Sequence, residues 1–459
     1  MKIKLCLFLL GFTMISCAQV QKNEQIRIEE ESNSDSIAFF RNKDALCLFY
    51  QKLDLLEQNQ KRKINIVHIG DSHIQADIFT AKIRNGLQAI YGNGGFGFTF
   101  PYRVAKTNNS APINYLSVGN FESCRNSLAE SSKQIGLSGL ALETKNKNFV
   151  IQLQVENAQY NFTKLKIITP NNANMFAVAT DTLNLDDLLP TNISHLVKPG
   201  EFLGGIASKY GVSITNIKRI NNLKNDIIRD GQLLEIPSKQ THSTTNYTPI
   251  QLQESALYRS YVTSKPTNKI LIVPTPDADL FGLNGLVLEN DKHGIIYHSI
   301  GVNGAKASDY NKFSLFKEQL PVLNPDLVII SLGTNESYNK LSKADYFIQI
   351  EKMIAYIKEK SPETCILVTT PPPSILLKKY HNTYIEEYAD IIKDNATTLD
   401  YAVWDLLDIF GGNEAIDSNS QAGYMATDQV HYSKEGYEKQ GEMFVQTFVK
   451  SYEQYKLEK

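Results

Sequence analysis

The stretch Ile64-Asn-Ile-Val-His-Ile-Gly-Asp-Ser-His73 decides the fold of this chain. Its first six residues are mostly β-branched or apolar, as in a strand that lies inside a sheet. Gly70-Asp71-Ser72 ends that strand, and the residues from 74 to 91 favour a helix. The spacing of apolar residues between 39 and 56 predicts another helix before the strand.

The same alternation of strand and helix returns after residue 290. We expect strands at 294–300, 326–332, 365–370 and 401–406, and helices at 343–360, 382–398 and 433–455. Such alternation implies an α/β fold, in which a parallel sheet carries helices on both faces. Residues 37–105 and 290–459 are therefore expected to form one three-layer α/β/α domain.

The region between these two segments has a different character. Short strand candidates occur at 149–155, 165–168, 175–180, 269–273 and 286–288, separated by Asn, Pro and Gly. We interpret residues 106–192 and 240–289 as a β-rich, sandwich-like insert. The sequence does not separate a sandwich from a barrel.

A third unit lies inside that insert. Residues 194–197 and 233–236 favour strands, and 202–210 and 214–220 favour helices, which gives the order βααβ. The segment HLVKPGEFLGGIASKYGVSITNIKRINNLKNDIIRDGQLLEIP (195–237) closely resembles a LysM module, a family that binds glycans containing N-acetylglucosamine, such as peptidoglycan. Its framework residues are Gly200, Leu203, Ile206, Ala207, Tyr210, Gly211, Asn221, Gly231, Gln232, Leu234, Ile236 and Pro237.

The resemblance implies a LysM domain at 193–239. The glycan contacts expected from it are Gly200, Glu201, Phe202, Leu203, Asn221, Ile227 and Ile228. Glu201-Phe202 stands where the family often has Asp-Thr, in a loop that faces glycan. The alternative is a LysM fold that serves as a spacer.

The amino-terminal residues predict export. Lys2 and Lys4 precede an apolar stretch over 5–15, which is shorter than the ~20 residues that span a bilayer, so we interpret 1–16 as a signal peptide. Met14-Ile-Ser-Cys17 resembles a bacterial lipobox, which implies a lipid on Cys17; the alternative is cleavage after Ala18. Residues 17–36 would then tether the protein to a membrane, facing the periplasm or, alternatively, the cell surface.

Composition excludes several classes of protein. The formal net charge is −2, with 47 Lys and Arg against 49 Asp and Glu, so a nucleic-acid partner is not expected. Only five Cys are present, and three remain beyond residue 17. Disulfides are therefore not expected to organise the fold.

Polar residues with catalytic potential follow the predicted strands. Gly70-Asp71-Ser72 follows the first strand, Gly301-Val-Asn-Gly304 the second, and Gly333-Thr-Asn335 the third, while Asp428 and His431 precede the last helix. Carboxyl ends of parallel strands share one edge, so these groups should meet there. The Gly-rich segment 91–97 is expected to border the same edge.

Together these blocks resemble the SGNH (GDSL-type) hydrolase family. The resemblance implies that Ser72 is the nucleophile, His431 its base and Asp428 the group that orients His431. The backbone N–H of Ser72, that of Gly304 and the amide of Asn335 would form the oxyanion hole, with Gly301 as an alternative to Gly304. No Gly-x-Ser-x-Gly elbow occurs, which disfavours an ordinary α/β-hydrolase. No cofactor or metal is expected.

The combination of units predicts the function. The split hydrolase with a β insert resembles peptidoglycan O-acetylesterases, so we expect an esterase that removes O-acetyl groups from cell-wall glycan, at the muramic acid 6-hydroxyl of peptidoglycan. One alternative is a non-catalytic peptidoglycan-binding lipoprotein. Another is an acetylesterase or acetyltransferase that acts on a different polysaccharide.

Overall fold

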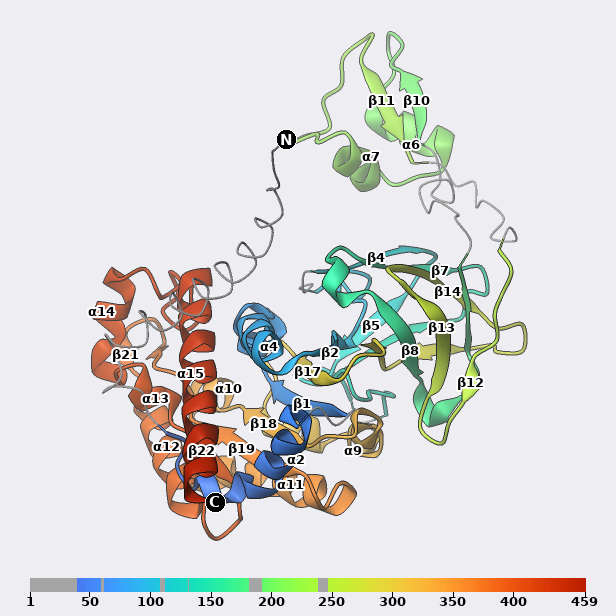
Figure 1. Cartoon of the computed structure of the whole chain (residues 1–459). Coiled ribbons are helices and arrows are strands. Elements are labelled where there is room, and N and C mark those ends of the chain that lie inside the picture. Colours follow the sequence, from blue (N-terminus) through green and yellow to red (C-terminus); the bar gives the residue numbers. More distant parts are fainter. Residues whose placement is uncertain (1–38, 59–61, 108–111, 131, 181–191, 238–246) are drawn as a thin grey trace, which may run out of the picture.

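A six-stranded parallel sheet forms the centre of the computed structural model, which describes residues 39–58, 62–107, 112–130, 132–180, 192–237 and 247–459 (Figure 1). Its strands, in spatial order, are β2 (Asn93–Gly95), β17 (Gly294–Gly301), β1 (Lys63–Gly70), β18 (Leu327–Ser331), β19 (Cys365–Thr369) and β22 (Ala402–Trp404). β1 pairs with β17 on one side and with β18 on the other. The early strand therefore lies between two late ones, which confirms the expectation of one α/β sheet formed by two segments.

Alternate residues of the strands face two separate cores. Ile64 and Ile66 of β1 pack with α2 (Cys47–Glu57), α4 (Ile78–Tyr91) and α15 (Lys434–Glu458). Val67 and Ile69 point to the other face, which is covered by further helices and by the β-rich region. The other described helices of the α/β domain are η1 (Lys43–Leu46), α3 (Ser72–Gln75), α8 (Ala307–Asn311), α9 (Ser314–Gln319), η4 (Leu320–Leu323), α10 (Thr334–Tyr338), α11 (Lys343–Lys360), α12 (Thr383–Asn395), α13 (Leu406–Ile409), η5 (Asn413–Ala415) and α14 (Ile416–Gln421).

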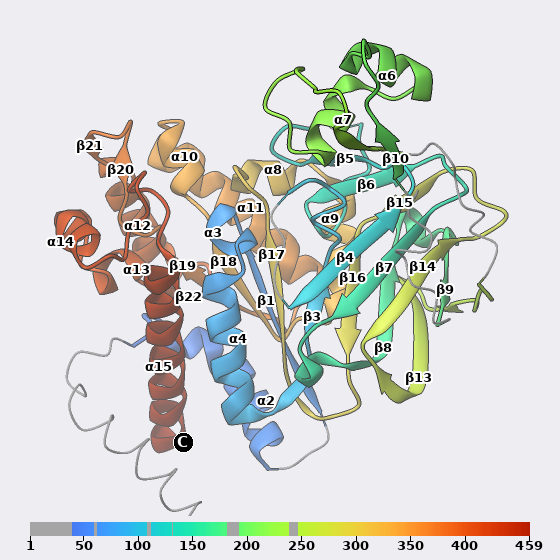
Figure 2. The ribbon, with the colours of Figure 1, turned by 90° about the horizontal axis from the view of Figure 1, so that it is seen from above.

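Three antiparallel sheets form the β-rich region, which lies beside the β2–β17 edge of the parallel sheet (Figures 1 and 2). Their orders are β12-β13-β8-β16-β3, β4-β7-β14-β9 and β15-β6-β5. The bounds are β3 (Gly97–Thr99), β4 (Ile113–Val118), β5 (Glu122–Arg125), β6 (Leu140–Thr144), β7 (Val150–Val155), β8 (Phe162–Ile168), β9 (Phe176–Ala179), β12 (Gln253–Glu254), β13 (Arg259–Thr267), β14 (Lys269–Pro274), β15 (Phe281–Leu283) and β16 (Gly285–Glu289), with η2 (Ala158–Tyr160) and η3 (Pro170–Asn172). Side chains from all three sheets share one buried core with one face of the parallel sheet.

The Gly-rich segment 91–97 lies elsewhere than expected. It forms β2 and the start of β3, and β2 pairs with Ile295 and Ile296 near the amino end of β17. The prediction that this segment borders the carboxyl-end site is therefore wrong. β3 pairs with β16, so the β-rich region begins at Gly97 and not at residue 106.

The module at 193–237 has the expected order βααβ, with β10 (Ile193–Leu196), α6 (Leu203–Tyr210), α7 (Ile214–Ile220) and β11 (Leu233–Ile236). Gly211 ends α6 with a φ of 63°, a left-handed conformation that favours Gly. The Ser213 hydroxyl accepts the N–H of Asn216 and caps α7. The two strands pair antiparallel, so Ile193 and Ile236 lie opposite each other. The module has a core of its own. It comprises Val197, Leu203, Ile206, Ala207, Ile217, Leu234 and Ile236.

The predicted signal peptide (1–16), the lipidated Cys17 and the tether (17–36) lie outside the described residues. Within the described ranges, no helix has both the length and the apolar character needed to cross a membrane.

Candidate active site

Ser72 is placed by a tight turn between β1 and α3. Gly70 ends β1 where a Cβ atom would lie 2.3 Å from the Ile74 side chain and 2.7 Å from the Ser331 carbonyl oxygen, so only Gly fits. The Asp71 carboxylate then accepts the backbone N–H of His73 at 3.0 Å and caps α3. Ser72 is the first residue of that helix, at the carboxyl edge of the parallel sheet.

His431 and Asp428 lie beside Ser72. The Ser72 Oγ is 2.9 Å from His431 Nε2, and His431 Nδ1 is 2.8 Å from Asp428 Oδ2. Asp428 accepts a hydrogen bond from Nδ1–H of His431. This tautomer leaves Nε2 without a proton, so Nε2 can accept a hydrogen bond from the Ser72 hydroxyl. The two side chains are each 42% exposed, so the site is open to a large substrate.

The charge on Asp428 is secured by hydrogen bonds. Burial alone would raise its pKa, but the His431 side chain and the backbone N–H groups of Val430 and His431 outweigh burial and hold the pKa at about 2. The two N–H groups donate to Asp428 Oδ1 at 3.0 and 2.9 Å. Asp428 is thus ionised and oriented at neutral pH.

His73 packs against His431 from behind. The two rings lie 5.2 Å apart at 35°, and His73 Nδ1 is 2.8 Å from the Tyr437 hydroxyl. Burial lowers the pKa of His73 to about 3, and a charge on His431 acts in the same direction. A neutral His73 can support the His431 ring but does not become protonated to the charged form at physiological pH.

The candidate oxyanion donors converge from the next two strands. Gly304 follows β17 with a φ of 78°, and no described residue accepts a hydrogen bond from its N–H. Gly301, the alternative, lies in β17, where a Cβ would be 2.2 Å from the Gln75 nitrogen, so it serves close packing against α3. This geometry favours Gly304. The Asn335 amide nitrogen is 3.0 Å from the Ala305 carbonyl oxygen and 3.2 Å from Asp71 Oδ2.

Two buried acidic residues, Asp71 and Glu336, lie next to the site, and the sequence patterns assign neither of them a role. Burial raises the pKa of Asp71 to about 7 and that of Glu336 to about 7. Asp71 holds the Asn335 amide, while Glu336 Oε1 accepts the N–H of Ala307 at 2.8 Å. Glu336 adjoins Asn335 in the sequence, which is the signal that could have identified it.

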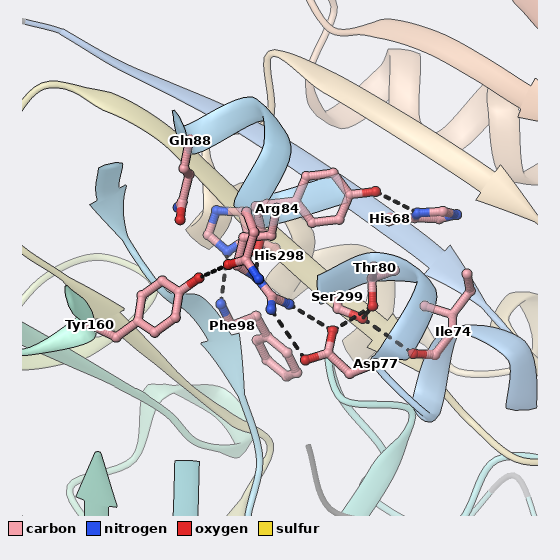
Figure 3. Close-up of polar contacts among 12 residues, drawn as sticks. His68, Ile74, Asp77, Thr80, Arg84, Gln88, Phe98, Tyr160, His298 and Ser299 are labelled. Carbon is pink, nitrogen blue, oxygen red and sulfur yellow. Dashed lines mark hydrogen bonds and ion pairs between the residues drawn. The ribbon is translucent and has the colours of Figure 1, made fainter. Parts of the chain in front are cut away.

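A buried polar network fixes the segment that follows Ser72 (Figure 3). The predicted single helix over 74–91 is instead interrupted at Asp77, whose φ is 52°. Arg84, 1% exposed, forms an ion pair with Asp77 at 2.7 Å, and the Thr80 hydroxyl donates to the same carboxylate. Ser299 of β17 contacts Thr80 at 3.1 Å. This network connects α4 to β17 directly behind α3 and so supports the position of Ser72.

The expected glycan contacts of the 193–239 module divide into two groups. Phe202 and Ile227 are 69% and 73% exposed, and Gly200 borders open space. Leu203 is 1% exposed and belongs to the core, so its prediction as a contact is wrong.

Three further predicted contacts are engaged within the module. The amide nitrogen of Asn221 donates to the carbonyls of Ile217 and Glu235, and its amide oxygen accepts the N–H of Glu235. Asn221 therefore stabilises the module itself. Glu201 contacts His195 Nε2 at 2.7 Å, and Ile228 packs partly buried against the core.

Comparison with known proteins identifies two domains. Residues 284–439 match the GDSL-like lipase/acylhydrolase family, and residues 195–237 match the LysM domain. The first match includes Gly304, Asn335, Asp428 and His431 but not Ser72, which the structure brings to them through β1. The chain is also 43% identical over 53 residues to the N-acetylmuramoyl-L-alanine amidase sle1 of Staphylococcus aureus, and spans only 16% of that protein's length.

The overall architecture resembles that of a solved peptidoglycan O-acetylesterase. The two share 18% identity with a TM-score of 0.62, and the likeness covers 89% of this chain and 96% of the other. At this identity the comparison shows a common fold over most of both chains.

Proposed function

We propose that this protein is a serine esterase that removes O-acetyl groups from peptidoglycan, at the 6-hydroxyl of muramic acid. The observation that carries the proposal is the continuous chain of short contacts from Ser72 through His431 to Asp428 at the open edge of the sheet. The GDSL-like domain, the LysM domain and the fold shared with a peptidoglycan O-acetylesterase support it.

The geometry supports a two-step reaction. His431 Nε2 takes the Ser72 proton as the Ser72 oxygen attacks the acetyl carbonyl carbon. The resulting tetrahedral intermediate collapses, the bond to the sugar oxygen breaks, and His431 returns the proton to that oxygen. Water, activated by the same His431, then attacks acetyl-Ser72 and releases acetate. Asp428 stabilises the imidazolium in both steps.

Three N–H groups would receive the oxyanion. They are the backbone N–H of Ser72, that of Gly304 and one N–H of the Asn335 amide. That N–H would leave the Ala305 carbonyl for the oxyanion, while Asp71 holds the other. Loss of one such donor typically raises the barrier by about 2.7–4 kcal/mol. No step requires a metal, so treatment with EDTA should leave the rate unchanged.

The substrate assignment rests on the accessory units. Phe202 and Ile227 give the LysM module exposed apolar side chains on which sugar rings can pack. The module would hold the enzyme on its polymer and raise the local concentration of acetyl groups. We further propose that Cys17 carries a lipid and that 17–36 tethers the exported enzyme to a membrane, facing the periplasm or, alternatively, the cell surface.

Acetate release tests this function. The purified protein is incubated with O-acetylated sacculi, with the same sacculi after mild base has removed the O-acetyl groups, and with acetyl-xylan. We expect fast acetate release from the first, none from the second and slow release from the third. Acetyl-xylan turned over faster than O-acetylated sacculi would overturn the peptidoglycan assignment, and no release from any acetylated substrate would overturn the esterase.

A further inference from the structure

The peptide unit that joins Asn303 to Gly304 is held by two parts of the molecule. It lies in the turn between β17 and α8, and its N–H is the backbone donor of Gly304 that the proposed oxyanion hole uses. The carbonyl oxygen of the same peptide unit, that of Asn303, accepts the Ser127 hydroxyl at 3.3 Å. Ser127 comes from the β-rich region, two residues after β5.

A planar trans peptide couples these two groups. Its C=O and N–H point in opposite directions, so a hydrogen bond that fixes the carbonyl also fixes the direction of the N–H. The N–H of Ala305 donates to the Val302 carbonyl at 3.0 Å and closes the turn, but this bond does not include the Asn303–Gly304 peptide unit. Gly304 has a φ of 78° and no side chain, so the direction of that peptide unit depends on other contacts. Ser127 Oγ lies 3.9 Å from the position of a Cβ on Gly304, which places Ser127 directly against this turn.

A second contact restrains the preceding peptide unit. The N–H of Asn303 donates to Gln75 Oε1 at 2.6 Å, and the Gln75 amide donates to Thr107 Oγ1 at 2.7 Å. Gln75 is 3% exposed and lies at the end of α3, three residues after Ser72. The turn is thus fixed between the helix that carries the nucleophile and the β-rich region.

The turn that carries Ser127 is itself rigid. The N–H groups of Leu128 and Ala129 both donate to the Arg125 carbonyl, at 3.1 and 2.9 Å, and the N–H of Asn126 donates to Gly139. Lys312, which follows α8 of the hydrolase domain, donates to the Ala129 carbonyl. Ser127 is therefore presented from a fixed support and not from a free loop.

We propose that Ser127 is a positioning residue for the reaction, through which the β-rich region aims the Gly304 N–H at the oxyanion. This inference rests on the proposed esterase function and adds to it: the β-rich region takes part in building the catalytic centre. The Gly304 N–H stabilises the negative charge that develops on the carbonyl oxygen of the substrate in the transition state. Loss of Ser127 should therefore weaken transition-state binding more than substrate binding.

Substitution of Ser127 tests the proposal, with another serine of the same strand region as control. Ser123 lies on β5 and donates to the Ala105 carbonyl at 3.0 Å, a similar bond away from the site. We expect Ser127→Ala to lower kcat on a nitrophenyl acetate about tenfold, the value of one hydrogen bond, with KM changed less than about twofold. Affinity for a phenylboronic acid, whose tetrahedral adduct on Ser72 places an oxygen in the oxyanion hole, should fall by the same factor as kcat.

Three outcomes separate this inference from the alternatives. Ser127→Thr, which keeps the hydroxyl, should recover most of the rate, and Ser123→Ala should match the wild type. Equal kcat and boronate affinity in Ser127→Ala and Ser123→Ala would overturn the inference while the esterase stands. Each rate is divided by the concentration of active sites, measured by titration with a phosphonate ester, so that misfolded protein does not affect the comparison. A wild-type enzyme without any esterase activity would instead overturn the proposed function.

Discussion

At the scale of single residues, the proposed reaction depends on three side chains from two distant parts of the sequence. Ser72 and His431 are separated by 359 positions and lie 2.9 Å apart. We expect Ser72→Ala and His431→Ala each to lower kcat on a nitrophenyl acetate by more than ~10³-fold. Ser72 supplies the attacking oxygen, and that oxygen is a poor nucleophile unless His431 removes its proton. Initial rates on purified variants check this, and a Ser72→Ala enzyme with more than about a tenth of the wild-type rate would contradict the assignment.

Asp428 should behave differently from the other two. Asp428→Asn keeps the shape of the side chain, and its amide oxygen stays with the N–H groups of Val430 and His431. The amide N–H donor is then turned toward His431 Nδ1, which favours the wrong tautomer. We expect a loss of about 10⁴-fold in kcat, which leaves measurable activity, whereas removal of the serine or the histidine of such a triad costs about 10⁶-fold. An Asp428→Asn variant with the wild-type rate would show that Asp428 does not orient His431.

The sequence predicts the candidate catalytic residues that the structure brings together, but it does not predict the residues that support them. Gly-Asp-Ser, the Asn335 block and the Asp428–His431 pair each form a short pattern at a strand end. Gln75 and Ser127 belong to no pattern, because their role arises from contacts with Asn303, more than 170 positions away. Only the folded chain brings these atoms together.

At the scale of elements, the structure differs from expectation where tertiary contacts override local preference. Residues 74–91 have the composition of one helix, but the buried Arg84–Asp77 ion pair stabilises a left-handed residue at Asp77 and divides it. The exact match of α11 (Lys343–Lys360) and α7 (Ile214–Ile220) to their predicted bounds reflects clear serine caps at Ser342 and Ser213.

The two ion pairs of Glu289, at the end of β16, give a prediction for stability. Glu289 joins Lys63 of β1 at 3.0 Å and Lys166 of β8 at 2.7 Å, and is 9% exposed. Burial would raise the pKa of Glu289, but Lys166 and Lys63 outweigh it and lower the pKa to about 2. A folded-state pKa below that of the unfolded chain stabilises the fold above pH ~4.5, and this stabilisation is lost as the pH falls toward 2.

Glu289→Gln should therefore lower the free energy of unfolding by roughly 3 kcal/mol at pH 7 and by much less near pH 3. Urea unfolding at a series of pH values measures this difference. Glu254→Gln serves as the control, because Glu254 is 67% exposed in its ion pair with Arg259 and should change stability by less than about 1 kcal/mol. A Glu289→Gln penalty that does not shrink on acidification would contradict the account of this ion pair.

At the scale of the whole molecule, the two inserted units relate to the hydrolase differently. The β-rich region shares a buried core with the parallel sheet, whereas the LysM module has a separate core and chain ends that meet at Ile193 and Ile236. The order of units was predictable from patterns along the chain. The shared core was not, because nothing in the apolar alternation of a strand shows which sheet it faces.

Deletion of residues 193–239, with a short Gly/Ser bridge in their place, should leave kcat on a small acetyl ester unchanged. The same variant should lose binding to insoluble sacculi and release acetate from them more slowly, because the module no longer raises the local concentration of substrate. Sedimentation with sacculi and acetate assays measure both effects. Unchanged binding after the deletion would assign recognition to the β-rich region or to the catalytic groove.

The identity of the nucleophile is tested most directly by covalent labelling. The protein is incubated with a fluorophosphonate, its acetate release from O-acetylated sacculi is followed, and the labelled peptide is identified by mass spectrometry. We expect one phosphonyl group per chain, on the peptide that contains Ser72, with activity lost in proportion to labelling and with labelling strongly slowed in His431→Ala. Full acetate release from a protein whose Ser72 is modified, or inactivation by a label on another residue, would contradict this assignment.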